Sequence, residues 1–301
     1  MATIGIFDSG AGGLSVFREI YRMLPEESYI YWSDNAFCPY GKKPQELIIE
    51  RSRHITDFLL SQGADIIVVA CNTATAAAIS ALRAGYSFNE DPVVAGHVLK
   101  LTSGRRDHVL FIGMEPAVKP AALQTRSGVV GVLATAGTLG GMKYHRTRDS
   151  FASGVRVVEH VGEGFVELVE SGKTSGPEAE SVVRASLQPL LDAGADVIVL
   201  GCTHYPFLMD VIRKIAGPSV AVIDPAPAVA RHLLDVMSSD SILPSSSGNV
   251  SETLSENLTG SHSETMSVTS SAPAPNIRLF ASGPIDPLLR LFSKVYNDKQ
   301  G

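Results

Sequence analysis

The stretch that decides the fold reads GADIIVVAC at residues 63–71, and it recurs as GADVIVLGC at residues 194–202. Each copy is a short, continuous apolar run, which is typical of a strand buried on both faces of a parallel sheet. Each copy also ends in a cysteine, Cys71 or Cys202. A weaker echo pairs residues 4–12 with residues 130–137, where a strand again runs into a small-residue turn. The chain is therefore expected to consist of two similar halves.

Apolar strands alternate with helical patterns over roughly the first 235 residues, which predicts an α/β fold with largely parallel sheets. Residues 14–24 and 45–62 each place apolar side chains on one helical face. Beyond residue 275, a last strand and a short amphipathic helix are expected. The expected strands are Ile4–Phe7, Tyr29–Trp32, Ile66–Ala70, Val109–Ile112, Val129–Leu133, Val197–Leu200, Val220–Ile223 and Ile277–Ala281, and the closing helix is Pro287–Tyr296.

The composition is that of a soluble globular protein with a sizeable core: 301 residues, 45% hydrophobic and 19% charged. A formal net charge of −6 gives no general footprint for nucleic acid or an anionic membrane, so neither is an expected partner. No stretch resembles a signal peptide or a membrane span, which predicts a cytoplasmic protein. The three cysteines are odd in number and widely spaced, and so favour free thiols over a disulfide framework or a zinc site.

The composition changes to Ser, Thr, Asn and Pro from Ser238 to about Pro275. Such a segment has almost no large apolar side chain to bury, which predicts a disordered or loosely held insertion that is dispensable for chemistry.

Both repeated strands deliver a cysteine at their carboxyl end, where parallel α/β sheets bind ligands. A lone cysteine after an apolar strand is more often a small buried hydrophobe than a reactive group. Two at equivalent places are harder to explain as packing, especially because polar residues follow each, Asn72-Thr73 and Thr203-His204. We therefore interpret Cys71 and Cys202 as functional.

Two facing thiols suit the inversion of a carbon centre, which needs a base on one face and a proton donor on the other. A thiol has an ordinary pKa of about 8.5, so one cysteine can be a thiolate while the other stays protonated. His204 is the expected helper of Cys202, and Asp8 either assists catalysis or is an ordinary turn residue. The glycines at positions 10, 12 and 13 do not match a dinucleotide fingerprint, and are expected to allow close backbone approach to a carboxylate.

Several motifs, in this order and spacing, resemble those of the glutamate racemases in the aspartate/glutamate racemase superfamily. The resemblance implies that Cys71 acts on the α-proton of D-glutamate and Cys202 on that of L-glutamate. It further implies that Asp8, His204 and Glu170 assist them, and that neither pyridoxal phosphate nor a metal is needed. The implied substrate contacts are Asp8, Ser9, Tyr40, Gly41, Asn72, Thr73, Thr203 and His204. The motifs are IGIFDSGAGGLSV (4–16), PYG (39–41), CNTA (71–74), GMEPAVKPA (113–121) and GCTHYP (201–206).

The resemblance also implies two pseudo-symmetric α/β domains with the active site in the cleft between them, in agreement with the echo. Residues 1–112 and 226–301 are then the first domain, with 238–275 as its insertion, and residues 113–225 the second. Glutamate is the implied substrate, and D-glutamate for peptidoglycan the implied product. A homodimer is one expected assembly.

Three features depart from the family pattern. Extra residues lie between Arg83 and Gly113, for which a hairpin on the domain edge is one possibility. The segment Val161–Gly164 differs from the family's usual sequence, which puts the position of Glu170 in question. Cys38, beside the PYG motif, is not required by the family and is expected to be a space-filling bystander.

Other readings are another cofactor-free racemase, acting on aspartate or a hydantoin, and a non-catalytic amino-acid-binding protein on the same fold. The CNTA and GCTHYP motifs favour glutamate, and the intact pair of cysteines argues against a protein without activity. A decarboxylase relative is expected to lack one of the two cysteines.

Overall fold

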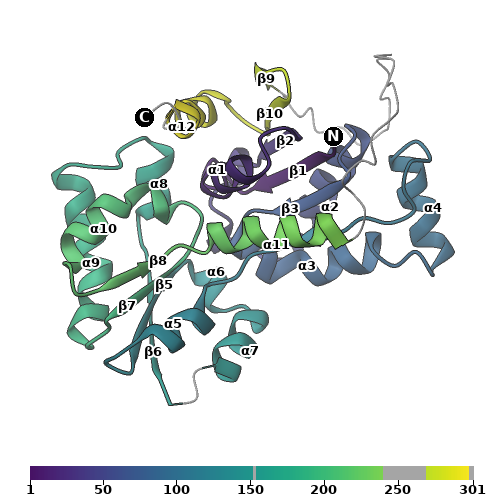
Figure 1. Ribbon diagram of the computed structural model, residues 1–301. Helices are drawn as coiled ribbons and strands as arrows, with labels where there is room; N and C mark the ends of the chain where they lie inside the picture. The colour runs from purple at the N-terminus through teal and green to yellow at the C-terminus, as the bar shows by residue number, and fades with distance from the viewer. Residues whose placement is uncertain (152–153, 240–268, 298–301) are drawn as a thin grey trace.

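Two sheets form the centre of the protein, as the computed structural model shows for residues 1–151, 154–239 and 269–297 (Figure 1). The first sheet has the strand order β4-β3-β1-β2-β10-β9 and the second the order β6-β5-β7-β8. Neighbouring strands are parallel, except that β9 is antiparallel to β10. The first sheet comprises β1 (Thr3–Asp8), β2 (Ser28–Ser33), β3 (Ile66–Val69), β4 (Phe111–Ile112), β9 (Thr269–Ala274) and β10 (Ile277–Ala281). The second comprises β5 (Val129–Ala134), β6 (Arg156–Val161), β7 (Val197–Gly201) and β8 (Ala221–Ile223).

The repeat seen in the sequence is a repeat of topology. Read from one edge, β4-β3-β1-β2 in the first sheet corresponds to β8-β7-β5-β6 in the second. The two strands that end in the repeated cysteines, β3 and β7, therefore occupy equivalent positions beside the central strands β1 and β5. The predicted α/β fold of two similar, largely parallel halves is confirmed.

A glycine in each central strand lets the repeated strand pack beside it. Gly5 pairs in register with Ile67, and Gly131 pairs with Ile198. A Cβ atom on Gly5 would lie 2.8 Å from Cδ1 of Ile67, and one on Gly131 would lie 2.6 Å from Cδ1 of Ile198. In both halves, the glycine of the central strand leaves the space that the equivalent isoleucine of the neighbouring strand occupies.

Helices cover both faces of each sheet. One apolar core runs through both halves and includes residues of α1, α9, α11 and α12, while α2 and α3 cover the other face of the first sheet and α5 and α7 that of the second. Within the described residues, no helix is both long and apolar enough to cross a membrane. The helices are α1 (Leu14–Met23), α2 (Gln45–Ser61), α3 (Asn72–Tyr86), α4 (Pro92–Leu101), α5 (Val118–Gln124), α6 (Ala136–Leu139), α7 (Met142–Phe151), α8 (Phe165–Glu170), α9 (Pro177–Asp192), α10 (Met209–Ala216), α11 (Ala226–Ser239) and α12 (Asp286–Asn297).

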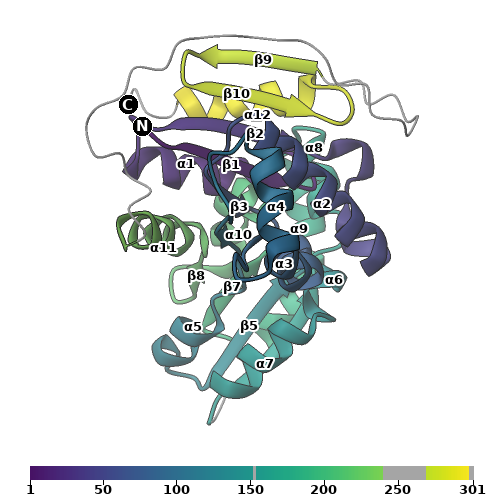
Figure 2. The ribbon, with the colours of Figure 1, turned by 90° about the vertical axis from the view of Figure 1, so that its right-hand side faces the viewer.

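The C-terminal segment returns to the first sheet, where β10 pairs with β2. Figure 2 shows β9 and β10 at the outer edge of that sheet, away from β5 and β7. The rings of Phe292 in α12 and Phe17 in α1 have centroids 5.7 Å apart. The last strand and the amphipathic helix expected from the sequence are both present.

Both boundaries of the insertion predicted over residues 238–275 are wrong. Helix α11 continues to Ser239, and residues 269–274 form the edge strand β9 against β10. This strand is held by backbone hydrogen bonds to β10, which need no apolar side chains and therefore leave no hydropathy signal. The remainder of the predicted insertion, residues 240–268, lies outside the described residues.

Two other elements differ from the expectation. The extra segment before Gly113 contains the helix α4 rather than a hairpin, because Asp91 caps it by accepting a 2.9 Å hydrogen bond from the backbone N–H of Val93, with Pro92 at the first helical position. Only the last two residues of the expected strand Val109–Ile112 are a strand. The strand β6 was not expected, because it is an exposed-to-half-buried edge strand that includes charged residues.

Candidate active site

The polar side chains that follow three strands meet around one small cavity. Cys71 follows β3, Cys202 follows β7 and Ser9 follows β1, and all three line this cavity. It measures about 10 Å³, close to the minimum that holds one water molecule. The full lining is Ser9, Pro39, Tyr40, Gly41, Cys71, Asn72, Thr73, Thr135, Val166, Cys202, Thr203 and His204. Of the predicted site residues, Asp8 and Glu170 alone lie behind this lining.

Cys71 is held at the N-terminus of α3. Its Sγ accepts a hydrogen bond from the backbone N–H of Ala74 at 3.4 Å and donates to Oγ of Ser9 at 3.8 Å. Burial, followed by the neighbouring Asp8 carboxylate, raises the pKa of the Cys71 thiol to about 12. In this arrangement Cys71 is a protonated thiol at neutral pH.

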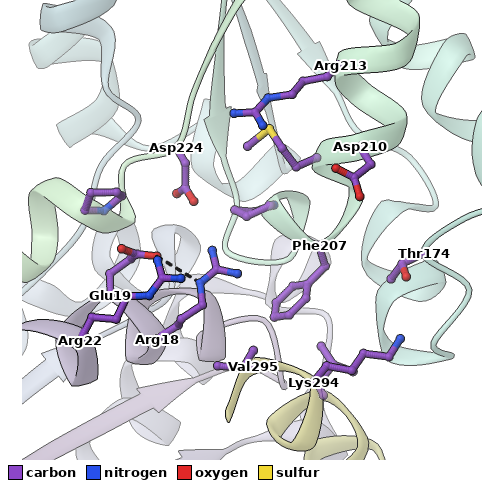
Figure 3. Close-up of a pocket in the computed structure, with 14 residues that line it drawn as sticks. Arg18, Glu19, Arg22, Thr174, Phe207, Asp210, Arg213, Asp224, Lys294 and Val295 are labelled. Carbon is purple, nitrogen blue, oxygen red and sulfur yellow. Dashed lines mark hydrogen bonds and ion pairs between the residues drawn. The ribbon is translucent and has the colours of Figure 1, made fainter. Parts of the chain in front are cut away.

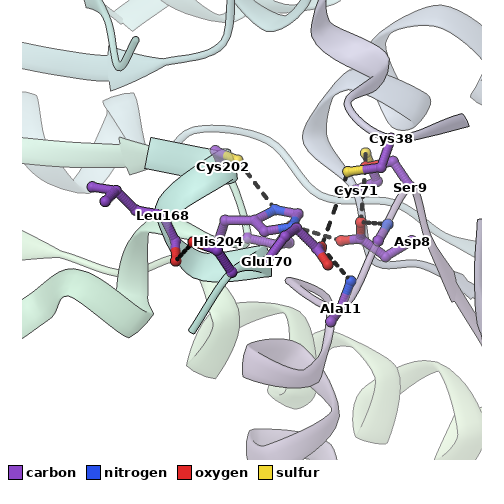
Figure 4. A network of polar contacts seen from close by, with 12 residues as sticks. Asp8, Ser9, Ala11, Cys38, Cys71, Leu168, Glu170, Cys202 and His204 are labelled. Carbon is purple, nitrogen blue, oxygen red and sulfur yellow. Dashed lines mark hydrogen bonds and ion pairs between the residues drawn. The ribbon is translucent and has the colours of Figure 1, made fainter. Parts of the chain in front are cut away.

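Cys202 begins a second chain of contacts, through His204 to Glu170 (Figure 4). Nδ1 of His204 lies 3.8 Å from Sγ of Cys202, and its Nε2 lies 2.7 Å from Oε1 of Glu170. Burial lowers the pKa of His204, but hydrogen bonds to neighbouring thiols and to Glu170 raise it well above its usual value. The imidazole is therefore a buried cation paired with a carboxylate.

Glu170 is fixed from two directions, at the end of α8. Besides His204, the backbone N–H of Ala11 donates to its Oε1 at 2.7 Å. Burial raises the pKa of Glu170, and the hydrogen bond and charge of His204 outweigh this effect and hold the pKa below its usual value. The close backbone approach expected of the glycine cluster thus serves a carboxylate of the chain itself.

The unusual segment at residues 161–164 still positions Glu170. Val161 ends β6, and Gly164 precedes α8 with a φ of 80°, a conformation that favours glycine. Gly162 accepts a 3.3 Å hydrogen bond from the hydroxyl of Tyr205. The helix that begins here ends at Glu170, within reach of His204.

Asp8 joins the two halves. Its Oδ1 accepts hydrogen bonds from the backbone N–H of Gly10 at 2.8 Å and from Ser9 at 3.0 Å. Its Oδ2 accepts one from Thr203 at 2.6 Å. Burial raises the pKa of Asp8, although the charge of His204 and these hydrogen bonds oppose the rise. Asp8 therefore both fixes the turn after β1 and links that turn to the second half through Thr203.

Asn72 has a buried amide without a partner. Neither its Oδ1 nor its Nδ2 is hydrogen-bonded to any described residue, and the side chain is nearly inaccessible. A buried amide that lacks partners costs about 1–3 kcal/mol, so such a group usually binds a ligand or water. Asn72 therefore presents a hydrogen-bond donor and an acceptor that no described residue satisfies.

The loop carrying Tyr40 and Gly41 contacts the second half. The hydroxyl of Tyr40 donates to Asp34 at 2.5 Å, and Arg51 donates to the same carboxylate at 2.7 Å. A Cβ atom on Gly41 would lie 3.0 Å from Cβ of Thr135. Tyr40 is thus anchored by a buried ion pair, and Gly41 allows the loop to approach the second half.

Sequence reasoning missed Thr135. Its hydroxyl lies 2.9 Å from that of Thr73, which links the two halves, and 3.0 Å from that of Thr138 in its own half. The weaker sequence echo aligns Thr135 with Ser9, and could have identified it. Cys38 was expected only to fill space, and its Sγ lies 4.0 Å from Oε1 of Glu170.

A larger hollow of about 620 Å³ lies apart from both thiols (Figure 3). Arg18, Arg213, Asp224 and Lys294 are among the residues that line it, and no cysteine is. The larger hollow is thus not the cavity at which the two repeated strands end.

Known proteins resemble this chain in sequence. The family model described as Asp/Glu/Hydantoin racemase matches residues 108–233. The chain is 46% identical over 244 residues to a glutamate racemase of Pseudomonas aeruginosa, covering 81% of this chain and 84% of the relative. It is 44% identical over 244 residues to a glutamate racemase of Stutzerimonas stutzeri, covering 81% of this chain and 85% of the relative.

Solved structures show the same likeness. The crystal structure of a glutamate racemase from Bacillus anthracis superposes with a TM-score of 0.74 at 27% identity, covering 98% of this chain and 94% of the other. Escherichia coli glutamate racemase, in complex with L-glutamate and the activator UDP-MurNAc-Ala, matches with a TM-score of 0.63 at 30% identity. That match covers 79% of this chain and 82% of the other.

Proposed function

Because the chain belongs to the glutamate racemase family, we propose that it inverts glutamate by moving the α-proton between Cys71 and Cys202. Membership makes the chain an amino-acid racemase with glutamate as its small-molecule substrate. One observation carries the mechanism: the two thiols end equivalent strands of the two halves and line one cavity. Opposed groups of this kind supply the base and the acid that inversion requires.

In the L-to-D direction, Cys202 is the base. The positive imidazole of His204, 3.8 Å from Sγ, stabilises a thiolate there. The thiolate takes the proton from Cα of L-glutamate, and the electron pair of the broken C–H bond stays on the substrate. The protonated thiol of Cys71 then gives its proton to the opposite face of Cα, which yields D-glutamate and leaves Cys71 as the thiolate.

A hydrogen-bonded path behind each thiol supports the reverse direction. On one side the path runs from Cys71 through Ser9 to Asp8, with distances of 3.8 Å and 3.0 Å. On the other it runs from Cys202 through His204 to Glu170. Asp8, whose pKa is raised by burial, can receive the Cys71 proton and prepare that thiol as the base for D-glutamate.

The remaining polar groups of the cavity bind the substrate in this proposal. Asn72 offers a free amide, and Ser9 and Thr203 offer hydroxyls at the strand ends. Tyr40, Gly41, Thr73, Thr135 and His204 complete the lining, with Asp8 behind it. A space of about 10 Å³ cannot hold glutamate, so the halves have to move apart for it to enter.

The cell-wall role follows from the product, because D-glutamate is a component of peptidoglycan. A cytoplasmic location and a homodimer stay predictions. For the domains we propose residues 1–112 with 226–301, and residues 113–225, because the strands of the two sheets divide in this way.

The test is incubation of the purified protein with L-glutamate in D₂O without added cofactor, with circular dichroism and the α-proton resonance followed together. Decay of the optical signal with entry of deuterium at Cα is expected. Loss of optical activity without deuterium entry would argue against proton transfer at Cα. Aspartate is the control substrate: a faster reaction with aspartate would favour an aspartate racemase, and silence with both would favour a binding protein without activity.

A further inference from the structure

We propose that Cys38, Glu170 and His204 form a binding site for Zn²⁺ and that occupation of this site stops racemisation. The three residues come from the loop after β2, the end of α8 and the loop after β7. Their sulfur, oxygen and nitrogen ligand atoms all lie within 4.8 Å of one another. The site goes beyond the proposed reaction, which makes no use of Cys38.

The ligand set suits Zn²⁺, a borderline-soft ion that binds thiolate, imidazole and carboxylate together. Bond lengths of about 2.0–2.3 Å in a tetrahedron place ligand atoms about 3.5 Å apart. Sγ of Cys38 is 4.0 Å from Oε1 of Glu170, close to this spacing. Nε2 of His204 is 2.7 Å from the same oxygen, so this pair has to open by about 0.8 Å.

The backbone leaves room for these three side chains to converge. A Cβ atom on Gly10 would lie only 2.2 Å from Oε1 of Glu170 and 3.0 Å from Sγ of Cys38. The glycine therefore allows both side chains to occupy the space in front of His204. Figure 4 shows Cys38 and Glu170 facing one another beside His204.

An entry path leads to the same place. A hollow of about 280 Å³ is lined by Cys38 and Glu170, together with Asn35, Pro39, Val166, Glu167, Pro284 and Pro287. It gives an ion a route that avoids the small substrate cavity, and it leaves space for water as the fourth ligand.

Charge is conserved when the ion binds. Before binding, the imidazolium of His204 balances the carboxylate of Glu170, and Cys38 is a neutral thiol. Zn²⁺ displaces one proton from Cys38 and one from Nε2 of His204, and both protons pass to solvent. The buried site thus exchanges two protons for one divalent cation, with no redox step and no net charge added.

Binding blocks the reaction because the ion lies between Glu170 and His204 and separates the two side chains. With Nε2 coordinated to metal, the imidazole can no longer form its 2.7 Å hydrogen bond to Glu170 or carry a proton at that nitrogen. The path from Cys202 through His204 is then broken, although both catalytic thiols remain free.

Co²⁺ is the probe for the binding site, because thiolate ligation gives it a charge-transfer absorption in the near ultraviolet. The full-length protein, treated with chelator and reductant, is titrated with Co²⁺ and then with Zn²⁺. One Co²⁺ per chain with this absorption, displaced by Zn²⁺, is expected for the wild type and for Cys71→Ala and Cys202→Ala. The absorption is expected to be lost in Cys38→Ser and Cys38→Ala, each with wild-type far-ultraviolet circular dichroism.

Inhibition of racemisation is the second readout. Each protein is compared with its own metal-free racemase activity, and Cys38→Ser should need at least tenfold more Zn²⁺ than the wild type for half-inhibition. An absorption that survives both Cys38 variants but disappears in Cys71→Ala or Cys202→Ala would overturn the proposal, as would a wild type that binds neither metal. Metal binding is measured in the absence of substrate, so this experiment tests the metal site alone. The racemase mechanism is tested separately, by the activity of the chelator-treated wild type.

Discussion

Replacement of Gly12 by alanine should move the catalytic imidazole while leaving the rest of the fold in place. A Cβ atom at this position would lie 2.3 Å from Nδ1 of His204 and 2.6 Å from its Cγ and Cε1. Ordinary contact begins near 3.4 Å, so the ring has to retreat by about 1.1 Å. That shift disturbs both of its contacts, at 3.8 Å to Cys202 and 2.7 Å to Glu170.

The expected effect on catalysis is large. A misplacement of about 1 Å in a positioned catalytic group costs about 100-fold in rate, equivalent to about 2.7 kcal/mol of activation free energy. Because the equilibrium constant of racemisation is one by symmetry, kcat/KM must fall by the same factor for L- and D-glutamate. Circular dichroism with each enantiomer measures both values, and thermal unfolding shows whether the variant is folded.

Gly85→Ala is the matched control for Gly12→Ala. Gly85 lies within α3, and a Cβ atom there would meet nothing within 4 Å. This variant should keep wild-type activity and be more stable by about 0.5–1 kcal/mol, because alanine favours the helix. If a folded Gly12→Ala protein kept kcat/KM within threefold of the wild type, the role given to His204 would be wrong.

Three further outcomes are expected. Cys71→Ala and Cys202→Ala should each lower racemisation at least 1000-fold in both directions, because inversion needs both thiols; a rate near wild type in either refutes the two-thiol mechanism. Gly131→Ala should lower the free energy of unfolding in urea by about 1–3 kcal/mol, because its Cβ would lie 2.6 Å from Ile198, and an unchanged midpoint would contradict this packing. The pKa of Glu170 is lowered from 4.5 in the folded protein, so its carboxylate stabilises the fold fully above pH 4.5. This stabilisation is lost as the pH falls through the pKa of Glu170 in the folded protein. The stability difference between wild type and Glu170→Gln should therefore shrink in acid, and a difference constant from pH 7 to 3 would show that the ion pair does not stabilise the fold.

The main strands were predictable because their signal is local. Strands β3 and β7 are continuous apolar runs, because burial on both faces of a sheet disfavours polar side chains. The strands β6 and β9 were missed because edge strands rest on backbone pairing, which many side chains permit. Asp91-Pro92, the N-cap and first residue of α4, is a local start signal that favours a helix over an edge hairpin.

By itself the sequence determined which groups stand at the strand ends, including Cys71, Cys202 and the polar residues after them. Those identities can be seen without the fold, because hydrophobic runs are a property of neighbouring positions and the repeat of residues 63–71 at 194–202 appears when the sequence is compared with itself. Only the tertiary structure decided which groups meet. Glu170 reaches His204 across 34 positions of the chain, and Cys38 reaches Glu170 across 132. The first contact depends on how α8 and the loop after β7 are arranged within one half, and the second on how the two halves pack together; no local propensity or spacing encodes either arrangement.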